Sequence, residues 1–169
     1  VDYRSNAQSV EVFLKTIFVR DVYYNPESAF NNVMAFKVAS VLVKSFVLAS
    51  AIALSFKHKK QLFKVLSIWV VALFLTQPRT ATYAQILWLI PAIEVVRSGL
   101  SKKWKVAFLC VLLLVCNFPF HWLRGGPVVF EFSRMWLSIA LAFISFRCFN
   151  FRFNATFLKA FLLLSIPLL

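Results

Sequence analysis

The sequence is poor in the residue types on which most soluble enzymes build their sites. It contains 3 glycines, 3 cysteines and 2 histidines in 169 residues. So few glycines exclude a glycine-rich phosphate-binding loop, and no nucleophile elbow is present. The histidines and cysteines lack the spacing of zinc ligands, so we expect neither a metal nor a cofactor. The cysteines are odd in number and all fall inside apolar runs, which predicts no disulfide framework.

Acidic residues are also scarce, and this leaves the chain strongly basic. It has 6 Asp and Glu against 19 Lys and Arg, a formal net charge of +13. A nucleic-acid-binding domain gathers its cations on one wet face. Here the cations instead lie in the loops that separate the apolar runs. We therefore expect no nucleic-acid partner, and we expect anionic lipid headgroups or a lipid phosphate in its place.

Apolar residues dominate the rest of the chain. Hydrophobic residues make up 61% of it, and the mean hydropathy is +0.78, whereas soluble domains have about 45–50% apolar residues. The apolar runs cover 33–56, 62–77, 82–97, 106–123, 133–149 and 156–169. A helix that crosses a bilayer needs about 20 residues, so the shorter runs predict tilted or partly re-entrant helices. The sequence predicts an all-α, polytopic transmembrane helix bundle of about six spans over residues 33–169.

The connections between these runs alternate in charge. Every second connection is rich in cations and holds no acid: Lys57, His58, Lys59, Lys60 and Lys64, then Arg97, Lys102, Lys103 and Lys105, then Arg147 and Arg152. The positive-inside rule assigns such loops to the cytoplasm. Residues 1–32 are then extracytoplasmic. We expect an integral membrane protein of a plasma membrane, the inner membrane of a bacterium.

Residues 1–32 form an extracytoplasmic segment that contains one amphipathic helix. The apolar face of this helix recurs at helical spacing and consists of Val10, Phe13, Leu14, Ile17 and Phe18. The polar face consists of Glu11, Lys15 and Thr16. Ser5 and Gln8 are spaced for a capping box at its start. The helix is too short and too charged to cross a bilayer, which favours a position in the membrane interface. Packing beneath a soluble domain is the alternative.

Ionisable residues at membrane depth are candidates for function, because each costs about 2.5–3.5 kcal/mol to insert. Lys37 and Lys44 are seven positions apart and so share one helix face. Lys37 lies near the outer end, where it can simply extend to the interface. Lys44 lies deeper and needs a partner or a wet cavity. Glu94 is three positions before Arg97, and we expect these two to pair.

Two outer turns carry polar candidates. In the turn 77–85, Arg79 offers a fork of donors suited to phosphate oxygens. Tyr83 offers an amphipathic ring for a sugar or a headgroup, although both residues also suit ordinary interfacial anchors. His121 and Arg124, beside a Gly-Gly-Pro turn, form a second candidate that common surface chemistry explains as well.

The order of three short motifs resembles a known family. The run Asn6-Ala7-Gln8-Ser9-Val10 leads into the amphipathic helix and a span; two spans later come Pro78-Arg79-Thr80-Ala81-Thr82-Tyr83 and an apolar run that ends Leu89-Ile90-Pro91-Ala92. Residues 4–100 thereby resemble the later half of glycosyltransferase family 87. These are polytopic GT-C-class enzymes that transfer a sugar from a polyprenyl-phosphate donor to an acceptor on the outer face. The chain departs from the family's pattern at Ala7, Lys15 and Thr82.

The resemblance implies the C-terminal part of a hexosyltransferase, with a polyprenyl-phosphate sugar and membrane lipids as partners. It implies contacts to the donor phosphate and lipid from Lys37, Lys44, Arg79 and Tyr83. It also implies possible loop contacts from Asn6, Gln8, Ser9, His121 and Arg124. The family's general base is expected upstream of Val1, so the resemblance identifies no catalytic residue here and leaves open whether this chain alone is an enzyme.

Two other function classes remain. A transporter or channel subunit would line a polar pathway with Lys44 and Glu94, although the sequence shows no inverted repeat. A non-catalytic membrane scaffold would bind partners through aromatic, lipid-facing helices, and the 20 phenylalanines fit that alternative.

The orientation can be tested by labelling single thiols in intact cells. In a background in which the native cysteines are replaced by serine, we expect a membrane-impermeant maleimide to label Thr80→Cys and not Ser101→Cys. Permeabilised cells, in which both positions should react, are the control. Labelling of position 101 alone in intact cells would reverse the orientation.

Overall fold

The computed structural model describes residues 9–20, 28–77, 82–117, 128–153 and 155–165. Within these ranges every regular element is a helix, which confirms the all-α class. In chain order the helices are α2 (Val10–Phe18), α3 (Val33–Lys57), α4 (Leu62–Thr76), the 3-10 helix η1 (Thr82–Trp88), α5 (Leu89–Arg97), α6 (Lys102–Asn117), α7 (Val128–Glu131), α8 (Ser133–Cys148) and α9 (Ala155–Ser165).

The helices follow the apolar runs, with two differences. α6 begins at Lys102, four residues before the predicted run 106–123. The third run, expected as a single span over 82–97, divides into η1 and α5 at Trp88 and Leu89. Pro91 is the third residue of α5, where its missing N–H is tolerated because the first turn of a helix has no intrahelical acceptors. The proline therefore begins the α-helical part and does not break it. With the steeper rise of a 3-10 helix, η1 and α5 together are roughly 27 Å long.

Length separates α3 from the other helices. Among the described residues, α3 alone, with its 25 residues, is long and apolar enough to cross a membrane by the usual criterion of about 20 residues. α4 and α9 are apolar but shorter. The structure therefore confirms helices at the predicted positions. Of the described helices, α3 is the one that meets the length criterion for a complete span.

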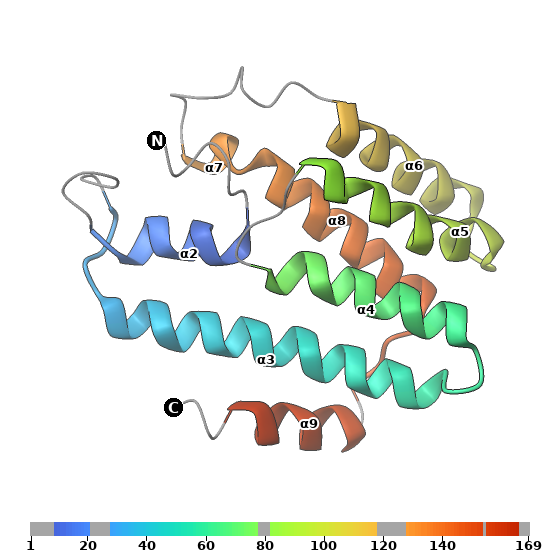
Figure 1. Cartoon of the computed structure of the whole chain (residues 1–169), viewed down its shortest axis with the longest axis horizontal. Coiled ribbons are helices and arrows are strands. Elements are labelled where there is room, and N and C mark those ends of the chain that lie inside the picture. The colour runs from blue at the N-terminus through green and yellow to red at the C-terminus, as the bar shows by residue number, and fades with distance from the viewer. Residues whose placement is uncertain (1–8, 21–27, 78–81, 118–127, 154, 166–169) are drawn as a thin grey trace.

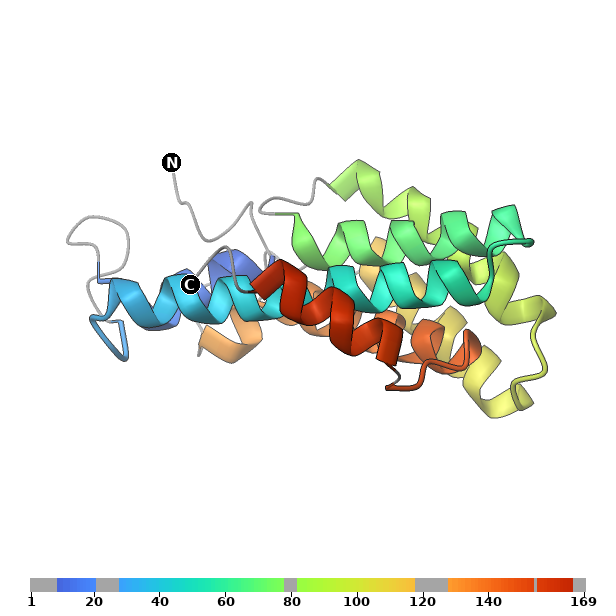
Figure 2. The ribbon, with the colours of Figure 1, turned by 90° about the horizontal axis from the view of Figure 1, so that it is seen from below.

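Successive long helices reverse direction (Figure 1). The connections 58–61, 98–101 and 149–153 consequently lie at one end of the molecule, and α7 and the start of η1 lie toward the other. α9 runs alongside α3, the helix pair in closest contact (Figure 2). The cation-rich connections predicted from the sequence therefore gather at a single end, which we call the basic end.

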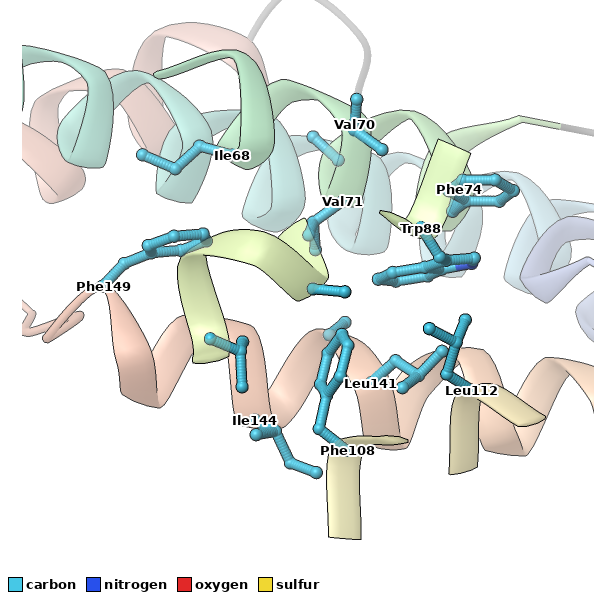
Figure 3. Close-up of a cluster of buried hydrophobic side chains, with 14 of the residues drawn as sticks. Ile68, Val70, Val71, Phe74, Trp88, Phe108, Leu112, Leu141, Ile144 and Phe149 are labelled. Atoms are coloured by element: carbon cyan, nitrogen blue, oxygen red, sulfur yellow. The ribbon is translucent and has the colours of Figure 1, made fainter. Parts of the chain in front are cut away.

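The core lies where α4, η1, α5, α6 and α8 meet (Figure 3). The indole of Trp88 stacks on the ring of Phe74, with centroids 4.8 Å apart. Phe108 from α6 and Leu141 from α8 complete this layer, and both are fully buried. On α3 the buried residues are mostly small, including Ala49 and Ala53, which allows α9 and α4 to approach the α3 backbone closely.

α2 forms at its predicted position, but its cap and its buried face differ from the prediction. Ser9 is the N-cap, and its hydroxyl accepts the Val12 N–H at 3.2 Å; Ser5 lies outside the described residues. The buried positions are Val12 and Thr16, although Thr16 was expected on the polar face. The Thr16 hydroxyl is satisfied by donating to the Val12 carbonyl at 2.9 Å.

The partner of α2 explains this rotation. Phe13 packs edge-on against Phe132 and Trp136, at centroid distances of 5.3 and 5.2 Å. These contacts turn Val12 toward Phe132 and Met135 on the start of α8. Part of the apolar face is therefore covered by protein, where the sequence predicted burial in the membrane interface. Leu14 and Ile17 remain partly exposed.

α8 ends in a Schellman motif built around Asn150. The Phe151 N–H donates to the Phe146 carbonyl at 3.0 Å, and the Asn150 N–H to the Arg147 carbonyl at 3.2 Å. Asn150 has φ 52°, the left-handed conformation that this motif requires. The rings of Phe146 and Phe151, 5.8 Å apart, supply the accompanying apolar contact.

We expect Asn150→Gly to leave stability unchanged or slightly raised, and Asn150→Val to lower it by about 1–2 kcal/mol, because a β-branched residue disfavours positive φ. Thermal unfolding of the two variants in the same detergent measures the difference. An equal loss for both would mean that the Asn150 side chain, and not its backbone conformation, stabilises the turn.

Candidate functional site

The structure describes some of the predicted site residues and not others. Lys37 and Lys44 lie on α3 and share a face, as their spacing predicts. Ser9 caps α2, and Tyr83 belongs to η1 by its backbone. The remaining predicted contacts lie outside the described residues: Asn6, Gln8, Arg79, His121 and Arg124.

Lys44 forms an ion pair with a residue of α2. Its Nζ lies 2.7 Å from Oε2 of Glu11, and the two side chains are 40% and 29% exposed. The sequence indicated that a partner or a wet cavity was needed, but it did not identify Glu11. A phosphate that approached Lys44 would have to compete with this carboxylate. Lys44 is therefore better suited to hold α2 against α3 than to bind the donor phosphate directly.

The segment after α2 fixes the register of this ion pair. The Phe30 N–H donates to the Ile17 carbonyl at 2.9 Å, and the Asn32 N–H to the Phe18 carbonyl at 2.8 Å. The rings of Phe18 and Phe30 stack at 5.8 Å. The chain thus returns along the end of α2 before α3 begins, and α2 lies beside the first half of α3 (Figure 1).

Lys37 is in a different situation from Lys44. Its side chain is exposed, and it has no hydrogen-bond or ion-pair partner among the described residues. It lies two turns closer to the start of α3 than Lys44, at the end of the molecule opposite the basic end (Figure 1). Of the two lysines, Lys37 is the one whose charge is available to an anionic ligand.

A second polar feature lies in η1, which begins three residues after Arg79 in the sequence. Gln85 is 2% exposed, and neither its amide nitrogen nor its amide oxygen has a hydrogen-bond partner in the part of the chain that the structure describes. The indole N–H of Trp88, three residues later, is fully buried and also has none. In a 3-10 helix, residues three apart lie on the same side. Each buried polar group without a hydrogen bond lowers the stability by about 1–3 kcal/mol. A polar ligand or an ordered water molecule that bonds to Gln85 and Trp88 removes this cost.

The sequence analysis placed Gln85 in a polar turn and Trp88 in the third apolar run, and it assigned a role to neither. Their role depends on the burial of both side chains, and the sequence of a short helix does not show which side chains are buried. An amide both donates and accepts, and an indole N–H only donates. Together they can bind a hydroxyl-bearing group. Neither can act as a general acid or base.

Glu94 does not take part in this site. Its carboxylate forms no ion pair with Arg97 among the described residues, contrary to the expected pairing. Its carbonyl oxygen lies 3.7 Å from the sulfur of Cys148, at the end of α8. Lys44 pairs instead with α2, so the structure does not bring Lys44 and Glu94 together. Within the described ranges, no group of three His, Cys, Asp or Glu side chains could hold a metal.

The ion pair can be tested with a double-mutant cycle. We expect Glu11→Gln and Lys44→Gln each to lower stability, with a coupling energy of about 0.5–1 kcal/mol, because both groups are partly exposed and solvent screens them. Thermal unfolding of the single and double variants in detergent gives this energy. The matched control is the cycle of Glu11 with Lys37, which should show no coupling. Additive losses in the first cycle would show that the pair does not hold α2.

No family model matches the chain, and no curated protein or solved structure matches it either. The resemblance to glycosyltransferase family 87 therefore depends on the short motifs that suggested it. A function has to be supported by the positions of the residues themselves.

Proposed function

We propose that the chain is a polytopic membrane protein whose basic end faces the cytoplasm. Large apolar side chains remain exposed along the sides of the helices, where a water-soluble bundle would present polar groups. They include Leu66, Trp69 and Leu73 on α4, Leu109, Leu113 and Leu114 on α6, and Leu158, Leu162 and Leu163 on α9. With apolar residues on both faces, these helices suit lipid better than water. Neighbouring helices can shield the ends of those that are short.

At the opposite end, we propose a binding site for a polyprenyl-phosphate sugar, as the donor side of a GT-C-type glycosyltransferase. The observation that carries this proposal is the buried, unpaired amide of Gln85 beside the indole N–H of Trp88. A sugar hydroxyl both donates and accepts hydrogen bonds, so it can satisfy both. This polar pair lies in η1, within a few residues of Arg79 and Tyr83 in the sequence.

The donor phosphate requires cations near the outer interface, because its tail lies in the bilayer. Lys37 has an available charge, and Arg79 has the fork of donors that matches phosphate oxygens. Charge on the leaving phosphate increases during transfer, and such cations stabilise it. Lys44 serves a positioning role through Glu11. Activation of the acceptor hydroxyl requires a carboxylate, and the family resemblance identifies none among the residues of this chain.

We expect Arg79→Ala to lower sugar transfer about a hundredfold, in the range seen when one charge-stabilising donor is removed. Gln85→Leu should also lower transfer, yet raise the thermal stability, because it removes unpaired polar atoms from a buried position. Transfer is measured in membranes supplied with a panel of labelled polyprenyl-phosphate hexoses, and membrane insertion by the yield of extractable protein.

Lys103→Gln is the matched control, since it removes one positive charge from the basic end. It should leave transfer unchanged. The proposal fails if Arg79→Ala reduces insertion as much as transfer, because Arg79 would then be a membrane anchor. It also fails if Gln85→Leu raises stability without any loss of transfer, because the unpaired amide would then have no ligand.

A further inference from the structure

A cavity of about 540 Å³ opens at the basic end, between the end of α3 and the chain that joins α8 to α9. This size is within the range of small-molecule sites, roughly 300–1,000 Å³. Its lining is Ala53, Leu54 and Lys57 from α3, with Asn150, Phe151, Arg152 and Phe153 from the connection. It is distinct from the proposed donor site, which lies at the opposite end of the bundle.

Two cations line this cavity, and its lining contains no acid. The Lys57 Nζ donates to the Asn150 carbonyl at 2.6 Å, which holds the ammonium group at the cavity wall. His58 Nε2 lies 3.1 Å from the Phe149 carbonyl and must carry the proton, since that oxygen only accepts. The guanidinium of Arg152 is exposed and has no partner among the described residues. Its donors are therefore available to an anion.

The Schellman motif of α8 holds these groups in place. Its left-handed residue, Asn150, turns the chain back toward α3, and the Phe149 and Asn150 carbonyls are the ones that His58 and Lys57 bind. Arg152 follows directly after this turn. The two cations thus come from segments about 95 residues apart in the sequence and meet because a rigid turn joins them.

The rest of the cavity wall is apolar and continues along the bundle. Phe151 and Phe153 lie 5.3 Å apart, and Phe157 of α9 lies 5.6 and 5.2 Å from them. Phe46 of α3 packs against Phe157 at 5.5 Å. Phe153 is 74% exposed. An apolar surface therefore leads from the cations along the seam between α3 and α9.

We infer that this cavity binds the phosphate of an anionic glycerophospholipid, with Arg152 and Lys57 on the headgroup and an acyl chain along the seam lined by Phe153. The inference depends on the membrane orientation proposed above and not on sugar transfer. Basic pockets between membrane helices on the cytoplasmic side favour anionic lipid headgroups. Inorganic phosphate can bind to the same two cations, but it has no acyl chain to contact the aromatic side chains of the cavity wall.

The test is native mass spectrometry of the purified full chain in a neutral detergent, with phosphatidylglycerol, phosphatidylcholine and inorganic phosphate as separate probes. We expect phosphatidylglycerol to bind at least tenfold more tightly than phosphatidylcholine. Arg152→Gln should weaken phosphatidylglycerol binding about tenfold, the loss expected for one charge-assisted hydrogen bond. Phe153→Ala should weaken binding of the lipid and leave binding of inorganic phosphate unchanged.

Lys103→Gln is the matched control, because it removes the same charge from the same end, away from the cavity. An equal loss of phosphatidylglycerol binding in Lys103→Gln and Arg152→Gln would overturn the inference in favour of diffuse charge attraction. Displacement of the lipid by an equal concentration of inorganic phosphate would assign the cavity to the free anion. Sugar transfer does not enter these measurements, so they stand or fall separately from the proposed donor site.

Discussion

The constraint on which this structure depends is that polar groups must be satisfied within an apolar chain. Helices satisfy most backbone groups locally, and four of the serines inside them do the same with their side chains. The hydroxyls of Ser50, Ser67, Ser145 and Ser165 each donate to the carbonyl four residues earlier. At the end of α8, where backbone carbonyls have no helical donors, Lys57 and His58 supply them. The buried hydroxyls of Ser40 and Ser55 on α3 have no partner among the described residues, and neither do the side-chain polar atoms of Gln85 and Trp88. Gln85 and Trp88 differ in lying three residues apart on one side of η1, where a single ligand can contact both.

The same constraint explains why one ion pair matters for the arrangement at the opposite end. A partly exposed pair such as Glu11 and Lys44 contributes little free energy by itself. The pair instead fixes the position of α2, because it joins this short helix to one point along α3. Phe13 then meets Phe132 and Trp136, and the start of α8 is covered. The ion pair and the aromatic contacts thus hold α2 against both α3 and the start of α8.

The sequence predicted much of the fold, because charges and prolines bound the apolar runs. The limits of α3, α4 and α8 agree with those runs to within two residues. The division at Trp88 was not predicted, because apolar content does not separate a 3-10 helix from an α-helix. The buried face of α2 was predicted wrongly, because it is set by Phe132, which is distant in the sequence. At the site, the need of Lys44 for a partner was predicted correctly, but its partner was not identified.

The excess of positive charge has a consequence beyond orientation. Cations gathered at one end of a bundle repel one another, which opposes compact packing. Among the described residues, Glu94 is the acid at that end, and it forms no ion pair there. The described residues therefore leave the positive charge at that end without a paired acid. Each Lys or Arg close to an anionic leaflet gains about 1 kcal/mol of electrostatic attraction. Anionic lipid headgroups can therefore supply the negative charge that the basic end lacks. Under this proposal, the uneven charge that orients the helices also makes anionic lipid part of what stabilises them.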